Sequence, residues 1–342
     1  MEKGCLVRNI TPDMEISGIF ILVNPSLLSS RNGSYWRIFL TDVTGSLEGK
    51  IWPPKSAEYK ELPSGLPVIA RGRSVLYRDQ LQLRVEDLRY LTEGEKQELD
   101  KKDFLPVSKR DIDEMMAELR SISLEVFRHG PWRRLFQSVF GEPEIQENFK
   151  TSPAARSVHH TWVGGLLEHT LGVAKLCLAL ADLYPDIDRQ TLLSGALYHD
   201  LGKIREFSSD FSVEYTDEGQ LQGHGYLGLE MLLPHISKSR LEPYLADHLK
   251  HLILSHHGLP EYGATKIPAT PEAFILHFAD NTDARMAQCQ GIFEKENVKP
   301  GSWSSWQKTL DRKLFHALPT PDPASNREKS SQEGICLSLL KE

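Results

Sequence analysis

The chain has 342 residues, of which 40% are hydrophobic and 25% are charged, and its formal net charge is −7. This length suggests two domains, or one large domain with an appendage. The acidic balance argues against a protein coated with nucleic-acid-binding surface, and no apolar run approaches the roughly 20 residues that span a bilayer. The start of the chain lacks an apolar signal-peptide core, so we expect a cytoplasmic protein with no membrane partner.

Residues 1–92 contain five short runs rich in Ile, Val, Leu and aromatic residues, separated by Gly, Pro, Asn and Ser. Such runs predict β-strands, and five of them in a segment of this length suit a small closed barrel, most commonly an OB-fold. We therefore predict an OB-fold nucleic-acid-binding domain over residues 1–92. The expected strands are ISGIFILVN, YWRIFLTDVTG, LEGKIW, LPVIARGRSVLY and LQLRVEDLRYL.

The predicted barrel is the part of the chain best suited to a polyanion. It carries 12 Lys and Arg against 10 Asp and Glu, whereas the remainder carries 28 against 37. OB-folds hold single strands by stacking bases on aromatic side chains in a basic groove, at roughly 1–3 kcal/mol per base. Since alternate side chains of a strand point inward, we expect Phe39 in the core and Trp36 and Tyr77 on the surface. The candidate contacts are Trp36, Trp52, Tyr77, Arg37 and Arg73.

Residues 93–150 change to a helical pattern. The charged string TEGEKQELDKKD reads as a link, and Ser108 with Asp111 resembles a capping box in front of an amphipathic run that ends near Phe127. Apolar residues recur at helical spacing again from Trp132 to Phe140. We predict a helical linker and packing region with no chemistry of its own.

The next helix is expected to bury a histidine. His169 falls at helical spacing with four apolar residues, so all five share one face. A buried histidine needs a polar partner, which a metal or a carboxylate can provide. The four apolar residues are Val173, Leu176, Leu180 and Leu183.

Four further segments carry the same kind of polar residue. A helix from Arg189 to Leu201, with Asp188 as N-cap, carries His199 and Asp200. The loop-like string GHGYLG contains His224. Helices are also expected over residues 244–257 and, after a Thr-Pro start, over residues 271–289. These last two carry His256 with His257, and Asp280.

Imidazole and carboxylate groups in this order indicate a metal site. Mixed ligands of this kind suit manganese, iron or zinc better than magnesium. An aspartate that bridges two ions is the usual way to build a two-metal hydrolase. The HD pair by itself is a weak signal, because any helix end can carry it, whereas the ordered set is a strong one.

The strings HHTWVGGLLEHT, GALYHDLGK, GHGYLG, LILSHHG and ILHFADNTDARM carry a family resemblance. His169, the HDLGK string and Asp280 resemble the HD superfamily of metal-dependent phosphohydrolases. The fuller strings resemble one branch of it, the YhaM-type 3′-to-5′ exoribonucleases. The resemblance implies an N-terminal small β-barrel (OB-fold) followed by an all-α HD-type phosphohydrolase domain, which we expect over residues 151–318.

The resemblance also implies two divalent metal ions and their ligands. Manganese is the expected metal, with iron, zinc, cobalt or magnesium as alternatives. One ion would be held by His169, His199, Asp200 and Asp280. The second would share Asp200 and take His224 and His256, with His257 as the alternative to His256. Another HD branch has a glutamate for a third ion where this chain has Gly165, so we expect two ions at most.

Asp200 and Lys203 are the expected catalytic residues. Asp200 would bridge the ions that activate a water, and Lys203 would neutralise a phosphate oxygen or protonate the leaving group, unless it is only a solvated cation at a helix end. Five further residues are candidates for contact with the substrate phosphate or for positioning metal ligands. They are His159, His160, His257, Asp283 and Arg285.

The leading functional hypothesis is a 3′-5′ exonuclease that degrades single-stranded RNA to nucleoside monophosphates, with single-stranded DNA left open as an additional substrate. One alternative is an HD phosphodiesterase or nucleotidase that acts on small nucleotides. Another is a single-strand-binding accessory protein with a degenerate HD site. A homo-oligomer is left open. The string PGSWSSWQKTLDRKLF predicts one more turn and helix, and residues 319–342 read as a flexible tail.

Overall fold

The computed structural model describes residues 3–155, 160, 162–208, 211 and 213–320 of the chain. The chain divides after Ala284 into two compact units. No helix among the described residues is long and apolar enough to cross a membrane.

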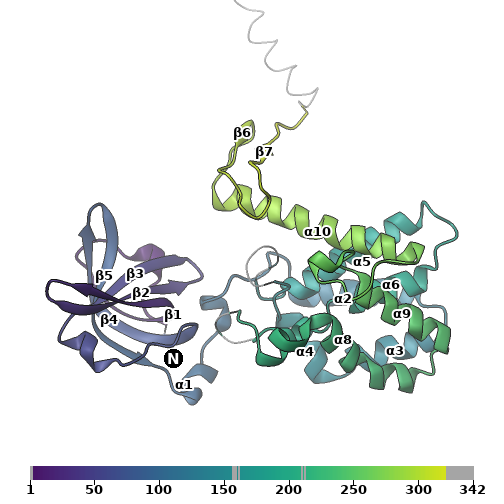
Figure 1. Cartoon of the computed structure of the whole chain (residues 1–342), viewed down its shortest axis with the longest axis horizontal. Helices are drawn as coiled ribbons and strands as arrows, with labels where there is room; N and C mark the ends of the chain where they lie inside the picture. The colour runs from purple at the N-terminus through teal and green to yellow at the C-terminus, as the bar shows by residue number, and fades with distance from the viewer. Residues whose placement is uncertain (1–2, 156–159, 161, 209–210, 212, 321–342) are drawn as a thin grey trace, which may run out of the picture. The chain divides into compact units, whose positions relative to one another are not determined.

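The N-terminal part is a closed five-stranded barrel (Figure 1). Its strands follow the order β1-β2-β3-β5-β4, and β4 pairs with β1 to close the ring. All neighbours are antiparallel except β3 and β5, which are parallel. This is a five-stranded OB-fold arrangement, as the sequence predicts. The strands are β1 (Glu15–Ser30), β2 (Gly33–Asp42), β3 (Gly45–Ile51), β4 (Leu66–Tyr77) and β5 (Gln80–Tyr90).

Along β2 the inward positions are the even ones, so the expected assignment of its aromatic residues is wrong. Trp36 is only 8% exposed and lies in the barrel core together with Ile38 and Leu40, whereas Phe39 is half-buried. The register follows from the side chains that fit the barrel interior, where Ile38 and Leu40 are completely buried. Tyr77, 52% exposed, lies on the surface as predicted.

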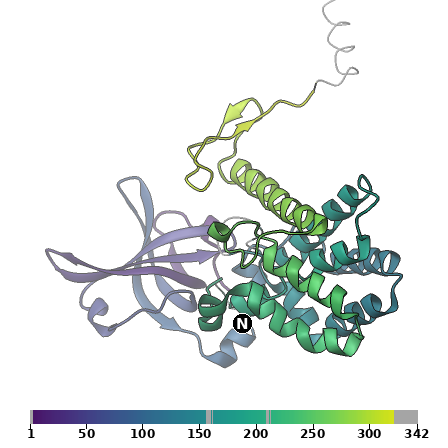
Figure 2. The same cartoon turned by 45° about the vertical axis from the view of Figure 1, so that its right-hand side comes forward.

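The rest of the first unit is helical (Figures 1 and 2). Its core is built from large apolar side chains such as Trp132, Phe140, Phe149 and Tyr198, all essentially inaccessible to solvent. Helix α5 packs on α4 and α6, and α9 packs on α6 and α8. The helices are α1 (Glu93–Gln97), α2 (Ile112–Val126), α3 (Gly130–Phe140), α4 (Pro143–Thr151), α5 (Gly165–Ala181), α6 (Arg189–Tyr198), α7 (Lys203–Glu206), α8 (Asp217–Ser239), α9 (Pro243–Ser255) and α10 (Pro271–Lys295).

Local signals explain most of the helix ends. The Asp188 side chain accepts hydrogen bonds from the first turn of α6, and the Thr270 hydroxyl accepts one from Ala273 at the start of α10, both as predicted. Helix α2 is capped by Asp111 and not by Ser108. The backbone N–H of Ser108 instead donates to the carbonyl of Val163, which pins the linker beside the start of α5.

Three further expectations need correction. Leu183 lies beyond the end of α5 and is 70% exposed, since the buried stripe of that helix runs through residues such as Val173 and Cys177. His224 lies within α8, directly after a kink at Gly223 whose φ of 72° is non-helical. In the second unit, the expected last helix is instead a pair of short strands. These are β6 (Ser302–Trp303) and β7 (Phe315–His316).

Candidate metal centre

The six predicted metal ligands converge from five helices. His169 comes from the second turn of α5, His199 and Asp200 from the end of α6, and His224 from the kink of α8. His256 caps α9, and Asp280 lies within α10. His169 and His199 are completely buried, and Asp200 and His256 are each 2% exposed.

One group of ligand atoms surrounds the Oδ2 atom of Asp200. It lies 3.4 Å from His169 Nε2 and 3.3 Å from His199 Nε2, and these two nitrogens are 3.3 Å apart. Asp280 Oδ1 lies 3.2 Å from His169 Nε2. Ligand atoms about 2.1 Å from a shared ion are separated by roughly 3.0–3.4 Å in tetrahedral or octahedral geometry. The spacing therefore matches a coordination shell.

A second group surrounds the other oxygen of the same carboxylate. Asp200 Oδ1 lies 3.5 Å from His224 Nε2 and 3.7 Å from His256 Nε2, which are 3.4 Å from each other. His257 Nε2 lies 2.9 Å from His224 Nε2 and completes the group. Although buried, Asp200 Oδ1 has no hydrogen-bond partner among the described residues. A buried carboxylate oxygen without a donor is costly unless a cation binds it.

The far nitrogens of the histidines fix their protonation. His199 Nδ1 lies 2.9 Å from the carbonyl of Ala196, and His256 Nδ1 lies 2.6 Å from that of Ile253. A carbonyl only accepts, so Nδ1 carries the hydrogen and Nε2 of the neutral ring presents its lone pair. These lone pairs point at carboxylate oxygens and at other imidazoles, which is a repulsive arrangement without a cation. The donor set thus fits divalent metal binding.

Electrostatics differ between the two groups. Burial alone would lower the pKa of His169, but Asp200, Asp280 and Asp283 raise it well above its usual value, so this group favours a positive charge. Burial lowers the pKa of His256 well below its usual value, and burial together with His224 lowers that of His257 to about 4. Around neutral pH those two rings are therefore neutral, as metal ligands must be.

Lys203 lies against the first group. Its ammonium is 2.6 Å from Asp200 Oδ2, and the residue is 8% exposed. Burial works to lower the pKa of Lys203, but the charge of Asp200 and the hydrogen bond to it outweigh this effect and raise the pKa. The side chain therefore stays charged. Because it is buried, it is not a solvated cation at a helix end, which was the alternative role considered from the sequence.

Sequence reasoning missed two supporting residues, Glu206 and Gly202. The Glu206 carboxylate accepts from the backbone N–H of His224 at 3.0 Å and lies 2.9 Å from its Nδ1. In the HDLGK string, a side chain on Gly202 would overlap the backbone of His224, so glycine allows α8 to approach. Of these residues only Gly202 could have been noticed in the sequence, as a glycine inside the HDLGK string. The contact of Glu206 with His224 joins two separate segments, so no local pattern predicts it.

The remaining substrate candidates fall into different surroundings. His160, 5% exposed, bonds to Asp283, which also bonds to His169, while His257 joins the second histidine group. Arg285 donates to the side chain of Gln288 at 3.2 Å. His159 lies outside the described residues.

On the barrel, three of the candidate contacts share an outer face. Trp52 stacks on Tyr35 with ring centroids 4.3 Å apart, and Arg37 pairs across β2 and β3 with Lys50. The Lys50 ammonium lies 5.2 Å from the ring of Tyr77. We call Tyr35, Arg37, Lys50, Trp52 and Tyr77 the barrel aromatic face.

The other two barrel candidates do not join this face. Trp36 is buried, and its indole N–H donates to the carbonyl of Tyr59 at 3.3 Å. Arg73 lies on the outside of β4, opposite Arg84 of β5 and 3.8 Å from Asp13. Burial therefore removes Trp36 from the set of residues that could stack on a base.

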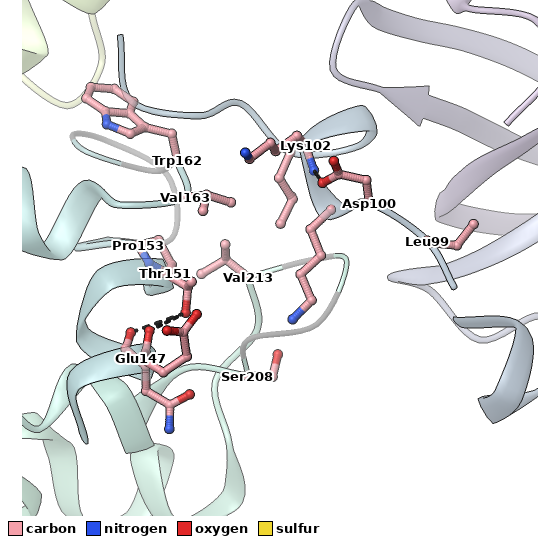
Figure 3. Close-up of a pocket in the computed structure, with 13 residues that line it drawn as sticks. Leu99, Asp100, Lys102, Glu147, Thr151, Pro153, Trp162, Val163, Ser208 and Val213 are labelled. Carbon is pink, nitrogen blue, oxygen red and sulfur yellow. Dashed lines mark hydrogen bonds between the residues drawn. The ribbon is translucent and has the colours of Figure 1, made fainter. Parts of the chain in front are cut away.

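A cavity of about 440 Å³ lies between the linker and the helical part (Figure 3). Lys101, Lys102 and Asp100 reach it from the linker, and Glu147 reaches it from α4. Trp162 lines its wall and donates through its indole N–H to Glu168 at 2.7 Å. The two lysines are offset by two carboxylates, so the lining has no net preference for a polyanion.

Comparison with known proteins identifies the family. The HD domain family matches residues 166–285, the segment that contains all six predicted ligands. The chain is 31% identical over 322 residues to the 3′-5′ exoribonuclease YhaM of Bacillus subtilis (strain 168), covering 92% of this chain and 98% of that protein. The 3′-5′ exoribonuclease YhaM of Bacillus licheniformis is 32% identical over 324 residues with the same coverage. The chain belongs to the YhaM family of 3′-5′ exoribonucleases.

The YhaM family match spans the barrel and the helical part together, because it covers 92% of the chain. Solved structures match single parts. The second OB-fold domain of replication protein A from Methanococcus maripaludis is 19% identical, with a TM-score of 0.22, and covers 25% of this chain and 93% of that one. The HD domain of the phosphodiesterase PgpH from L. monocytogenes is 18% identical, with a TM-score of 0.29, and covers 42% of this chain and 74% of that one.

Proposed function

We propose that this chain is a metal-dependent 3′-5′ exoribonuclease that shortens single-stranded RNA and releases nucleoside monophosphates. The observation that carries the proposal is the position of Asp200, whose two carboxylate oxygens face two separate groups of histidines. In a chain whose relatives are 3′-5′ exoribonucleases, such a carboxylate suits a two-ion phosphodiesterase.

We assign the ligands as follows. Asp200 Oδ2, His169, His199 and Asp280 would hold one ion, and Asp200 Oδ1, His224, His256 and His257 would hold the other. His256 and His257 are both included because both belong to the second group of donor atoms. Manganese is the metal that we expect for this imidazole and carboxylate set. Two such ions, when bound, lower the pKa of a water and offset the charge of a phosphodiester.

The chain's own residues supply orientation and charge. Lys203 carries a buried positive charge beside Asp200. In this position its ammonium can donate a hydrogen bond to a non-bridging oxygen of the scissile phosphate. Glu206 fixes the ring of His224, and the carbonyls of Ala196 and Ile253 fix those of His199 and His256. These bonds keep the donor atoms in place before the substrate binds.

Burial of the centre favours an exonuclease over an endonuclease. The donor atoms come from five helices, and four of the six predicted ligands are at most 2% exposed. A strand end reaches such a site more easily than the middle of a strand, and a duplex would have to unpair first. The choice of the 3′ end rests on the family, since nothing in the geometry of these side chains distinguishes the two ends.

The barrel aromatic face is the strand-holding surface in this proposal. Two stacked rings, a third ring and two cations on adjacent strands suit single-strand binding. Stacking accepts any base, so the same surface would also accept single-stranded DNA. The affinity should fall as salt rises, because phosphate contacts release counterions.

The proposal is tested with a single-stranded RNA labelled at its 5′ end and incubated with the protein and Mn²⁺. We expect a ladder of shortening products and nucleoside monophosphates, whereas a ligated circle of the same sequence stays intact. Cleavage of the circle, which has no end, would contradict the exonuclease proposal and indicate an endonuclease. Rapid turnover of a small nucleotide without any shortening of the strand would favour a nucleotidase. Binding without hydrolysis in Mn²⁺, Fe²⁺, Co²⁺, Zn²⁺ and Mg²⁺ would indicate an accessory protein.

A further inference from the structure

Asp283 joins two histidines that lie far apart in the sequence. Its Oδ2 atom is 2.7 Å from His169 Nδ1 and 3.0 Å from His160 Nε2. His169 uses its other nitrogen, Nε2, to face Asp200 and Asp280. One carboxylate oxygen therefore connects the back of a candidate metal ligand to a second buried imidazole.

His169 needs this contact more than the other histidines of the centre do. His199 and His256 are C-caps, where the carbonyl three residues earlier is free to accept from Nδ1. His169 lies inside α5, and the carbonyls of that turn already accept from backbone N–H groups of the helix. Its ring is instead held by a side chain from another element, Asp283 of α10.

The local packing is built around the same carboxylate. A Cβ atom placed on Gly172 would overlap Asp283 Oδ1. Gly172 follows His169 by three residues, so it lies on the same side of α5. A glycine costs a helix about 1 kcal/mol relative to alanine, and here it leaves the space that the Asp283 side chain occupies.

The three groups have the spacing of a metal site, but the protonation of His169 argues otherwise. His160, His169 and Asp283 offer atoms within 4.8 Å of one another. For a metal there, His169 would need a lone pair on Nδ1, although in the proposed centre Nε2 already uses its lone pair to hold the first ion. A neutral imidazole has a lone pair on only one nitrogen. Nδ1 therefore donates to Asp283, and the contact orients the ring.

We infer that Asp283, steadied by His160, is the positioning residue that aims His169 at the metal, and that Gly172 is a glycine because Asp283 fills the space beside it. The inference rests on the metal centre of the proposed function. Carboxylates that bond to the back of a ligating histidine typically contribute 10–100-fold to metal affinity.

The first test compares two glycine-to-alanine substitutions within helices. Gly172→Ala pushes Asp283 away, whereas a Cβ on Gly291 in α10 meets no atom of the described residues within 4 Å, so Gly291→Ala is the matched control. Mn²⁺ binding to the full chain is measured by calorimetry, and folding is checked by circular dichroism. We expect roughly 10–100-fold weaker binding of one ion in G172A and a change below about twofold in G291A. Equal affinities in the two variants would overturn the role of Gly172.

A second series keeps the inference testable even if G172A folds poorly. Asp283→Asn removes the charge with little change in shape, and we expect at least about tenfold weaker Mn²⁺ binding of one ion. His160→Gln keeps a donor for Asp283 and should bind Mn²⁺ better than His160→Met, which has similar bulk but no donor, a rescue that a purely steric role would not give. Parental Mn²⁺ affinity in a folded D283N protein would overturn the inference.

The readouts separate this inference from the proposed function. A parent protein that binds two Mn²⁺ ions without shortening RNA would contradict the exoribonuclease, while the positioning role would still be supported by weaker binding in D283N. Conversely, an active parent with a D283N variant of unchanged Mn²⁺ affinity would leave the enzyme in place and remove the positioning role. A parent that binds no divalent ion in calorimetry would overturn both.

Discussion

At the scale of single residues, Asp200 holds the central position in the candidate metal centre. Its two carboxylate oxygens face different groups of histidines, and the ammonium of Lys203 contacts one of these oxygens, Oδ2. Its pKa lies well below the usual value, because Lys203 and His199 outweigh the effect of burial, so it stays ionised. Among the described residues its Oδ1 has no hydrogen-bond partner, and the proposed function accounts for this oxygen as part of a ligand shared by two cations.

Asp200→Asn should abolish hydrolysis, because both ions lose a shared anionic ligand. We expect a loss of about 10³-fold or more in the single-turnover rate, equivalent to ~4 kcal/mol of transition-state stabilisation. Affinity for single-stranded RNA, measured by fluorescence anisotropy, should change little because the barrel is untouched. A rate within tenfold of the parent would contradict the two-ion assignment.

Lys203→Ala should lower kcat by about 10²-fold with a smaller change in KM, because the charge acts on the phosphate as it develops negative charge. Mn²⁺ affinity should be retained or rise, since the substitution removes a cation that competes for Asp200. Steady-state kinetics and calorimetry on the same preparation check this. If Mn²⁺ binding is lost together with activity, Lys203 has a structural role only.

At the scale of elements, the second strand of the barrel directs alternate side chains into the core and toward the outside. Trp36 points into the core, while Tyr35 and Arg37 point outward beside Trp52 and Lys50. Neighbouring aromatic residues on one hairpin therefore lie separately in the core and on the surface. The sequence pattern alone did not decide which residue serves which purpose.

Trp36→Ala and Trp52→Ala should have opposite consequences. Trp36→Ala empties the barrel core, and we expect about 3–5 kcal/mol of lost stability, visible in denaturant unfolding of the barrel. Trp52→Ala should leave unfolding nearly unchanged but weaken single-strand binding by roughly 1–3 kcal/mol. Tyr184→Ala, which changes a 55% exposed aromatic residue outside the barrel, is the control for RNA binding. Weaker RNA binding in Y184A to the same degree would remove the specific role of Trp52.

At the scale of the whole molecule, a five-stranded barrel and a buried candidate metal centre occur on one chain. The linker contacts the helical part through Val163, whose N–H donates to the carbonyl of Pro106 at 2.8 Å and whose carbonyl accepts from Ser108 at 3.0 Å. A variant without the barrel should therefore keep residues from Leu105 onward. The predicted domain limits at residues 92, 150 and 318 remain predictions, as do a homo-oligomer and a flexible tail, of which residues 321–342 lie outside the described part.

A chain that begins at Leu105 should still hydrolyse a small phosphodiester but lose its advantage on long RNA. We expect turnover of the small substrate within about tenfold of the parent, and a KM for long RNA raised by about tenfold or more, as the loss of one or two stacked bases implies. The parent's KM for long RNA should rise steeply with salt, and that of the shortened chain much less. Equal degradation of long RNA by both chains would show that the barrel does not hold the strand.

The sequence by itself determined the features that depend on neighbouring residues. Strand-forming runs separated by turn residues predicted the barrel, and Asp188 and the Thr-Pro pair at residue 270 marked two helix starts. The order of histidines and aspartates predicted the composition of the centre, because these side chains stand out on apolar faces. The family resemblance rested on the same ordered strings.

Only the tertiary structure decided what depends on contacts between distant segments. Which alternate residues of β2 point into the closed barrel was set by the fit of Ile38 and Leu40 in its core. The same alternation places the Trp36 side chain inside. The contact of Glu206 with His224 and that of Asp283 with His169 join separate helices. Periodicity records which face of an element is buried, but not which side chain of another element meets it there.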